Sequence, residues 1–334
     1  MEETECFCGS ARLAARSVAA RDGLTGAVFT YHACAECGAE RLTPRPDRAS
    51  IGAYYPSTYA SHRVRGNTLT ERLKTLICRT YQQPGGNPLL RLLLAPLRGH
   101  TVFAFHGVEP RRIFEFGAAT GNDLALFRDA GWEVSGCEPS ARACATAAAR
   151  GIVLENAPAE TAGLAPAAVS CVLINNVLEH VHDPGVVVAK AFDGLVPGGS
   201  LVIVVPNHRA WSARMFGGAW PGYDAPRHLW GFTPSSLSGL LRRSGFEAPT
   251  IHQRFQGIWA WSSSLDGRHS ALPVAAWRQR WARPLALALF PLGVVSAILG
   301  AGDFLTVVAR KPAGADPIDF SLEPVVSSTS TSRT

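Results

Sequence analysis

The sequence predicts an α/β fold built on a doubly wound, mostly parallel sheet, and three observations support this. The short apolar run Ile113–Phe116 is followed by a turn containing Gly117 and Gly121 and by a segment that can begin a helix. A second predicted strand then ends at Glu138. Further apolar runs alternate with helical segments up to residue 310, as in a chain of β-α units.

The first β-α-β unit, residues 112–140, has the features of a nucleoside-binding site. Glycines in the turn free the backbone, and the N-terminal amides of the following helix can face a ligand. Glu138 ends the second strand, where its carboxylate can accept hydrogen bonds from both ribose hydroxyls. Pro139 ends that strand, and Ser140 is a suitable N-cap for the alanine-rich helix predicted up to Arg150.

The glycine spacing distinguishes two kinds of nucleoside site. A dinucleotide site needs G-x-G-x-x-G for close approach of the pyrophosphate, but this chain has Gly117, Ala119 and Asn122 there. Instead, the segment from Glu115 to Gly121 resembles the first motif, acid-x-G-x-G-x-G, of the class I S-adenosylmethionine-dependent methyltransferases. Ala119 replaces the central glycine. Its methyl group narrows the loop without excluding a ligand that carries no phosphate.

The resemblance to this family extends over residues 109–312. The run VSCVLINN (169–176) is similar to the fourth strand, and "LEHV-x-D-P", "L-x-P-G-G" and the fifth strand Ser200–Val205 follow it in order. Thr233 is then an N-cap with proline next to it, and Phe304–Arg310 is the last strand. The resemblance implies a Rossmann-like sheet of seven strands with an antiparallel last strand.

The resemblance also implies S-adenosylmethionine as cofactor and suggests its contacts. Gly117 and Gly121 match positions at the methionine end of the cofactor, and Glu138 matches the ribose ligand. Glu115 matches the acid that orients the loop and the amino group. As an alternative, Glu115 caps only the amides of its own loop, because a buried carboxylate needs some partner.

Two more positions complete the predicted cofactor site. Ala157, with its neighbour Asn156, matches the family's usual contact with adenine, and Asn175 matches a contact near the methionyl part. The cofactor-binding residues implied by the resemblance are Glu115, Gly117, Ala119, Gly121, Glu138, Ala157 and Asn175.

Two segments at the carboxyl edge of the predicted sheet offer a general base. Methyl transfer from a sulfonium is an in-line displacement, so positioning supplies most of its rate, and a poorly acidic hydroxyl also needs a proton acceptor. Glu179 and His180 follow the fourth strand, and His228 lies in GYDAPRHLWGFT after the fifth. Histidine is the side chain most often tuned for this task. We predict His228 as base or substrate anchor, with His180 second.

The segment around His228 resembles a "W-x-x-x-D-x-P-R-H-L" element found in many such methyltransferases. It is too polar and too interrupted for a core segment, so Tyr223, Asp224 and Arg227 are predicted substrate contacts. In the alternative interpretation, Asp224 and Arg227 form an ion pair that pins a lid, and His228 bonds to a backbone carbonyl.

Cysteines near the amino terminus predict a separate metal site. Four of the eight cysteines of the chain, Cys6, Cys8, Cys34 and Cys37, form two pairs typical of a ribbon-type zinc site. The first pair is C-x-C rather than C-x-x-C. A disulfide is the alternative, but no secretory signal peptide is evident, so zinc in a cytoplasmic protein is favoured. Similar knuckles precede the methyltransferase domain in bacterial enzymes of sugar and glycan modification, where the ion is structural.

The predicted organisation is therefore a zinc-knuckle module at 1–46, a helical cap or linker at 47–108, and the methyltransferase domain at 109–312. Within the cap, Tyr54, Tyr55 and Tyr59 resemble a "YY-x-x-x-Y" element that helps cover the active site, although packing between modules is the alternative. Insertions are expected at 207–233 and 255–303, and residues 313–334 are expected to form a disordered tail.

The insertion at 255–303 is rich in tryptophan and arginine. Its stretch 284–302 carries no charge, but proline and glycines interrupt it and the chain must return at once to the last strand, so a membrane span is not expected. Three interpretations remain open: peripheral contact with the inner face of the membrane through 259–302, a helical lid, or a homodimer contact.

Composition limits the partners. The formal charge is 32 minus 26, or +6, over 334 residues, which suits an anionic small molecule or membrane but, without a basic run, not a nucleic acid. We expect methyl transfer to a hydroxyl or activated carbon of a small molecule, chiefly a sugar or glycan intermediate. The alternatives are a quinone or other lipid-borne acceptor and, outside enzymes, a non-catalytic cofactor-binding scaffold.

Overall fold

The structure is a computed structural model in which residues 1–55, 69–82, 87–94, 109–255, 257–266 and 276–314 are described. Tyr59, residues 56–68, 83–86 and 95–108 of the predicted cap, and nearly all of the predicted tail lie outside the described residues.

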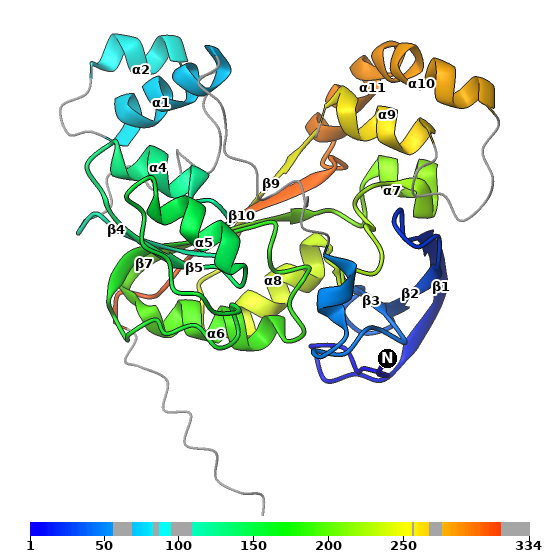
Figure 1. Cartoon of the computed structure of the whole chain (residues 1–334), viewed down its shortest axis with the longest axis horizontal. Coiled ribbons are helices and arrows are strands. Elements are labelled where there is room, and N and C mark those ends of the chain that lie inside the picture. The colour runs from blue at the N-terminus through cyan, green and yellow to red at the C-terminus, as the bar shows by residue number, and fades with distance from the viewer. Residues whose placement is uncertain (56–68, 83–86, 95–108, 256, 267–275, 315–334) are drawn as a thin grey trace, which may run out of the picture.

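A six-stranded sheet forms the centre of the described molecule, in the order β5-β4-β6-β7-β10-β9 (Figure 1). Its strands are β4 (Arg112–Phe116), β5 (Glu133–Cys137), β6 (Val169–Asn175), β7 (Leu195–Pro206), β9 (Thr250–Arg254) and β10 (Phe304–Arg310). Strands β5, β4, β6 and β7 are parallel, whereas β10 runs antiparallel to both β7 and β9. The antiparallel last strand predicted from the sequence is therefore confirmed.

The seventh predicted strand is reduced to a single bridge in the described chain. Beside β5, Glu155 makes one parallel bridge with Cys137. The Glu155 amide donates to the Gly136 carbonyl, and the Glu155 carbonyl accepts from the Glu138 amide, both at 2.9 Å. Pro158 follows three residues later and has no amide to continue a ladder. The sheet therefore ends at β5.

Helices cover both faces of the sheet, which confirms the doubly wound arrangement. Helices α4 (Asn122–Arg128) and α5 (Ala141–Ala148) lie on one face, and α6 (Pro184–Gly194) and α8 (Pro234–Arg243) on the other. Successive residues of β4 divide between the two cores: Ile113 packs with Leu124 of α4, and Phe114 lies in the core that contains Leu240 of α8.

Two predicted helix starts are confirmed at their caps. The Ser140 side chain accepts a hydrogen bond from the Ala143 amide at the start of α5. At the start of α8, Thr233 and Ser236 form a reciprocal capping box with proline at the first helical position.

A second sheet lies in the amino-terminal part of the chain, and the fold completes it with a distant segment. Its order is β1 (Leu13–Arg21), β2 (Val28–Cys34), β3 (Glu40–Leu42) and β8 (Trp230–Gly231). All neighbours are antiparallel, and Glu40 pairs with Gly231. The segment that carries His228 therefore runs directly into a strand of the N-terminal sheet.

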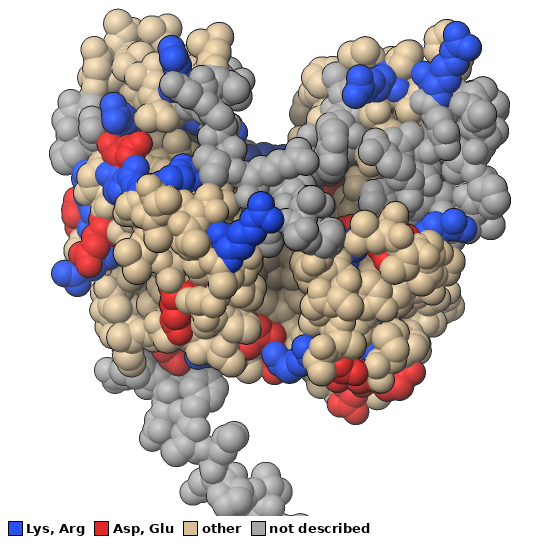
Figure 2. All heavy atoms as spheres, in the orientation of Figure 1, with Lys and Arg blue, Asp and Glu red and all other residues tan. Residues whose placement is uncertain are grey.

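Accessory helices form two lobes above the sheet in Figure 1. One lobe carries α1 (Leu69–Gln82) and α2 (Pro88–Leu94), which lie within the predicted helical cap or linker. The other carries α9 (Ile258–Asp266), α10 (Ala276–Ala288) and α11 (Phe290–Ile298), near α7 (Trp211–Phe216). Short 3-10 turns lie at Ile51–Tyr54 (η1) and Gly217–Ala219 (η4). Figure 2 shows a hollow between the lobes.

In the described part of the chain, no single helix has the length and apolarity to span a membrane. Two consecutive segments, Arg280–Ala288 and Phe290–Ile298, meet those criteria only jointly, and they are bent by 49° relative to each other.

Candidate functional site

The turn from β4 to α4 adopts the left-handed backbone that its residues predict. Gly117 has φ of 64° and Gly121 has φ of 70°. A Cβ on Gly117 would lie 2.4 Å from Cγ2 of Val177, and one on Gly121 would lie 3.0 Å from Cδ1 of Ile152. The left-handed backbone favours glycine at both positions, and at Gly117 a side chain would also collide with Val177.

Ala119 lies between them and is also left-handed, with φ of 48°. A side chain in this conformation crowds the backbone and costs about 1 kcal/mol relative to glycine. The family pattern has glycine at this position, and the structure gives the physical reason for that preference.

Glu138 connects this loop to the end of β5. It is buried, its Oε2 accepts a hydrogen bond from the Ala119 amide at 3.0 Å, and its Oε1 accepts one from the Ser140 amide at 2.9 Å. A carboxylate held between the glycine turn and the next strand end stands where the sequence places the ribose ligand. The position of this carboxylate thus fits an acceptor for the ribose hydroxyls of the expected cofactor.

The other predicted cofactor residues lie at the same carboxyl edge, because β4, β5 and β6 are adjacent and in register there. Glu115 is buried within β4. Asn175, at the end of β6, donates to Oδ2 of Asp123 at 2.8 Å. Asn156 donates to the Glu138 carbonyl at 3.0 Å, and Ala157 beside it is half-buried. In an open α/β sheet, this edge is where ligands bind.

The two predicted catalytic histidines meet beside this edge. The rings of His180 and His228 contact edge to face, with centroids 4.6 Å apart. Nδ1 of His228 lies 2.7 Å from the Gly222 carbonyl oxygen, and Nδ1 of His180 lies 3.0 Å from that of Arg227. Carbonyls only accept hydrogen bonds, so each Nδ1 carries the hydrogen and each Nε2 keeps its lone pair.

Burial keeps both imidazoles neutral. It lowers the pKa of His228 to about 3, helped by the nearby His180, and it lowers the pKa of His180 as well. Both rings are therefore uncharged at neutral pH and can accept a proton or bind a cation through Nε2.

Glu179 completes this cluster. Its carboxyl group is buried, and burial raises its pKa to about 8. Its main-chain carbonyl accepts bonds from the amides of Leu229 and Trp230, at 2.7 and 3.2 Å, which ties the turn after β6 to the segment of His228. The sequence singled out Glu179 only as the neighbour of His180.

The predicted substrate residues of the same segment are engaged within the protein. Arg227 pairs with Asp224 at 2.6 Å and with Asp22 at 3.1 Å. Burial alone would raise the pKa of Asp224, but the bonds and charge of Arg227 outweigh it and lower that pKa to about 2. The hydroxyl of buried Tyr223 donates to Glu40 at 2.9 Å. These contacts match the alternative in which an ion pair pins a lid.

Two residues that sequence reasoning missed connect the N-terminal sheet to the histidines. The hydroxyl of Tyr31, on β2, lies 2.5 Å from the Tyr223 carbonyl oxygen and 2.6 Å from that of His228. Buried Glu40, on β3, contacts Nδ1 of His208 at 3.0 Å and Nε of Arg16 at 2.9 Å. Alternation along β2 marks Tyr31 as inward-facing, whereas the three residues of β3 are all buried and show no alternation, and nothing local marks the distant partners of Tyr31 and Glu40.

The four N-terminal cysteines form a cluster that fits zinc. Their sulfur atoms all lie within 4.8 Å of one another, with Cys6 to Cys37 at 3.5 Å and Cys8 to Cys34 at 3.6 Å. Four thiolates at about 2.3 Å from one zinc ion are separated by about 3.8 Å. The contact between Cys6 and Cys37 raises the pKa of Cys6 and lowers that of Cys37 to about 5. The C-x-C pair is thus compatible with a four-sulfur site.

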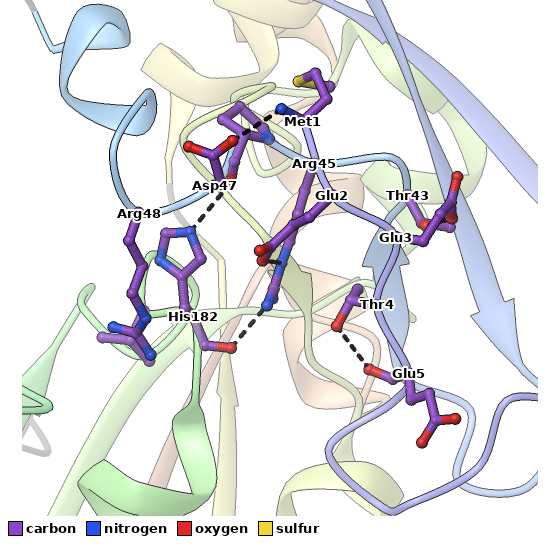
Figure 3. A network of polar contacts seen from close by, with 12 residues as sticks. Met1, Glu2, Glu3, Thr4, Glu5, Thr43, Arg45, Asp47, Arg48 and His182 are labelled. Carbon is purple, nitrogen blue, oxygen red and sulfur yellow. Dashed lines mark hydrogen bonds and ion pairs between the residues drawn. The ribbon is translucent and has the colours of Figure 1, made fainter.

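A polar network joins the cysteine-bearing segment to the central domain (Figure 3). Arg45 bonds to Glu2 at 2.8 Å and to the His182 carbonyl at 3.1 Å. His182 in turn bonds to the Pro46 carbonyl at 3.1 Å. The turn after β6 is therefore held from the N-terminal side as well.

Comparison with known proteins agrees with the site. A family model described as a methyltransferase domain matches residues 90–250, a little under half of the chain. The central sheet and the glycine turn lie within or next to the segment that is similar to this family.

Curated relatives come from mycobacteria. A Mycolicibacterium smegmatis protein described as a "probable S-adenosylmethionine-dependent methyltransferase" is 28% identical over 180 residues, which are 52% of this chain and 66% of that protein. An uncharacterized Mycobacterium tuberculosis protein is 32% identical over 182 residues, 52% of this chain and 59% of its own. The chain thus spans about three fifths to two thirds of these relatives.

Among solved structures, a SAM-dependent methyltransferase from Thermotoga maritima superposes with a TM-score of 0.44 and 18% identity, covering 73% of this chain and 92% of its own.

Proposed function

We propose that the protein transfers a methyl group from S-adenosylmethionine to a hydroxyl or activated carbon of a small molecule. One observation carries this proposal: the left-handed glycine turn and the Glu138 carboxylate share an edge of the sheet with a pair of neutral histidines. The methyltransferase-domain match over residues 90–250 supports it.

The glycines, Glu138 and the histidines have separate roles in the proposed reaction. When bound, the cofactor supplies an electrophilic methyl group. Gly117 and Gly121 leave room for a ligand against the backbone, and Glu138 offers a fixed acceptor for ribose hydroxyls. His228, with His180 second, presents a neutral ring nitrogen that can take up the proton of a hydroxyl acceptor. The segment containing Asp224 and Arg227 closes over this edge.

We favour a sugar or glycan intermediate as the acceptor. The cysteine cluster supports this, because knuckles like it accompany methyltransferase domains of bacterial sugar-modifying enzymes. The formal charge of +6 suits an acceptor that carries phosphate groups. The zinc ion would be structural, because its four thiolate ligands leave no open position.

A lipid-borne acceptor is the second candidate, and the surface of α10 and α11 favours it. Apolar side chains there are exposed, including Leu287 at 59%, Ile298 at 77% and Leu299 at 64%. Trp281 is 54% exposed, and Arg280 and Arg283 are exposed beside it. Figure 2 shows basic side chains on this lobe. Apolar and aromatic groups flanked by arginine are typical of peripheral binding to anionic membranes.

Vesicle sedimentation tests whether the protein binds membranes, as a lipid-borne acceptor would require and a soluble sugar would not. We expect binding to anionic phosphatidylglycerol vesicles to fall at least tenfold in Ile298→Ser/Leu299→Ser if this surface meets a membrane. Leu69→Ser, an equally exposed leucine on α1, serves as the control. Equal binding by wild type and double variant would leave the soluble sugar acceptor as the sole candidate.

Calorimetric titration tests the cofactor. We expect micromolar binding of S-adenosylmethionine and S-adenosylhomocysteine, lost in Glu138→Ala and in Gly117→Ala. Glu133→Ala, at the exposed start of the same strand, should bind normally. Absence of binding by folded wild-type protein would reject the proposed function and bring the non-catalytic scaffold forward.

A further inference from the structure

We propose that Glu179, His180 and His228 bind a divalent metal ion beside the methyl acceptor. The ligand set is distinct from the cysteine cluster, and it takes one carboxylate oxygen and two imidazole nitrogens from two segments of the chain. This inference rests on the proposed function for its role, but the site can be tested without any methyl transfer.

The geometry brings the three donor atoms together. One potential ligand atom from each residue lies within 4.8 Å of the other two. With metal–ligand bonds of about 2.1 Å, three ligands of one ion lie about 3.0 to 3.4 Å from one another, so the three groups need to close by up to about 1.5 Å. The two segments are already locked together, because the Glu179 carbonyl accepts from the amides of Leu229 and Trp230.

The imidazoles are oriented as metal-binding histidines usually are. In metal sites, the second ring nitrogen donates to a carbonyl or carboxylate, which fixes the ring and leaves the other nitrogen for the ion. Nδ1 of His180 contacts the Arg227 carbonyl and Nδ1 of His228 contacts the Gly222 carbonyl. The hydroxyl of Tyr55 also lies 3.0 Å from Nδ1 of His180.

The carboxylate of Glu179 independently indicates a missing cation. Glu179 is 1% exposed, and neither of its side-chain oxygens has a hydrogen-bond partner in the described part of the chain. The guanidinium of Arg227 is paired with Asp22 and Asp224. A buried carboxyl group without a partner costs several kcal/mol, and a bound cation would remove that cost.

The donor types select the ion. Two imidazoles and one carboxylate are typical of Zn²⁺, Fe²⁺ and Mn²⁺, whereas Ca²⁺ and Mg²⁺ prefer oxygen ligands alone. Three protein ligands leave positions open. An acceptor oxygen could bind there, which would favour loss of its proton to water. The oxygen lone pair then forms the bond to the methyl carbon while the carbon–sulfur bond breaks and leaves its electron pair on sulfur. The histidines would act as ligands in this reaction.

Manganese titration tests the site. Thiolates such as those of the cysteine cluster bind Mn²⁺ weakly, and Mn²⁺ is visible by electron paramagnetic resonance. We expect the zinc-loaded full chain to bind one additional Mn²⁺ per molecule. Affinity should fall at least tenfold in Glu179→Gln and His228→Ala. His32→Ala, which removes a half-buried histidine of β2 outside the cluster, is the matched control.

Three readouts keep the outcomes separate. Circular dichroism and cofactor titration show whether each variant is folded, and Glu179→Gln should retain cofactor binding. Stoichiometric Mn²⁺ binding that depends on Glu179 and His228 supports the site, even if no methyl acceptor is found. No additional ion in the wild type, whether Mn²⁺, Co²⁺ or Zn²⁺ is supplied, would overturn it, as would Mn²⁺ binding unchanged in both variants. Failure of S-adenosylmethionine to bind would reject the proposed function alone.

Discussion

Ala119 has a left-handed backbone conformation that its side chain disfavours. Its backbone is left-handed, its amide donates to Glu138, and the side chain contributes nothing that requires alanine. The strain of about 1 kcal/mol is stored in the loop predicted to hold the cofactor.

We therefore expect Ala119→Gly to raise the free energy of unfolding by about 0.5 to 1 kcal/mol, because relief of the strained conformation exceeds the entropy of the added glycine. Ala118→Gly, one residue earlier and buried, should lower it by a similar amount. Urea unfolding of both variants measures the difference. A loss of stability in Ala119→Gly would show that the left-handed backbone is not strained.

Glu40 is the second informative residue, since it is buried between Arg16, His208 and Tyr223. Burial alone would raise its pKa, but the hydrogen bond from His208 and the charge of Arg16 outweigh it and lower the pKa below its ordinary value of 4.5. With a depressed pKa in the folded state, the stability that Glu40 contributes is present above pH 4.5 and is lost as pH falls through the folded value.

We expect Glu40→Gln to destabilise the protein by about 2 to 3 kcal/mol at pH 7, because it leaves the buried partners of the carboxylate without their ion pair. The difference from wild type should shrink as pH falls below 4.5. Glu36→Gln, which breaks the exposed pair with Arg12, should change stability by less than about 0.5 kcal/mol. Thermal melts from pH 3 to 8 give the comparison, and a pH-independent difference would contradict the assignment.

How far individual residues can be predicted from the sequence depends on whether their partners are local. The glycines of the turn, Glu138 and the caps Ser140 and Thr233 interact within a few residues or across adjacent strands, and the structure places them as expected. Tyr31 and Glu40 act through partners almost two hundred residues away, and alternation within a short strand says nothing about such partners.

At the scale of elements, β2 supports the segment that carries the histidines. The Tyr31 hydroxyl is fully buried and faces two carbonyl oxygens, those of Tyr223 and His228. A tyrosine on β2 thus holds both ends of the segment from Tyr223 to His228.

We expect Tyr31→Phe to cost about 1 to 3 kcal/mol, because it leaves buried carbonyls unsatisfied, and to lower kcat without changing cofactor affinity. Tyr81→Phe is the matched control, since its hydroxyl donates to the Arg91 carbonyl between α1 and α2. That variant should lose comparable stability and keep kcat. Equal kcat in both variants would mean that β2 does not position the histidines.

Elements were predictable where apolar periodicity is strong. Strands β4, β6 and β10 lie within a residue or two of their expected bounds, and α8 begins after its expected N-cap, Thr233. The missing seventh strand was not predictable from the family resemblance, because Pro158 and the short run before it stop the ladder locally. The two residues of β8 carry no periodic signal at all, and only tertiary pairing defines them as a strand.

At the scale of the whole molecule, the N-terminal sheet and the central domain share a strand, β8, and a polar network around Arg45. We expect one cooperative thermal transition in zinc-loaded protein. S-adenosylmethionine at a hundred times its Kd should stabilise the folded state by about 2.7 kcal/mol and raise Tm by about 4 °C.

Differential scanning calorimetry with and without the cofactor checks this expectation, and hydrogen exchange of β2 and β3 gives a local readout. Protection of those strands should rise with the cofactor although they do not contact it in the proposed site. Two transitions, of which the cofactor shifts only one, would show that the two sheets unfold independently.

The pairing of β3 with β8 also has a consequence for biosynthesis. The four cysteines and β1 to β3 are translated before the central sheet, so the cysteine cluster can form while that sheet is still unmade. One edge of β3, however, stays unpaired until Trp230 and Gly231 arrive. The N-terminal sheet is thus begun before the central sheet but is completed only when β8 has been made, and until then the open edge of β3 can mispair with other nascent chains.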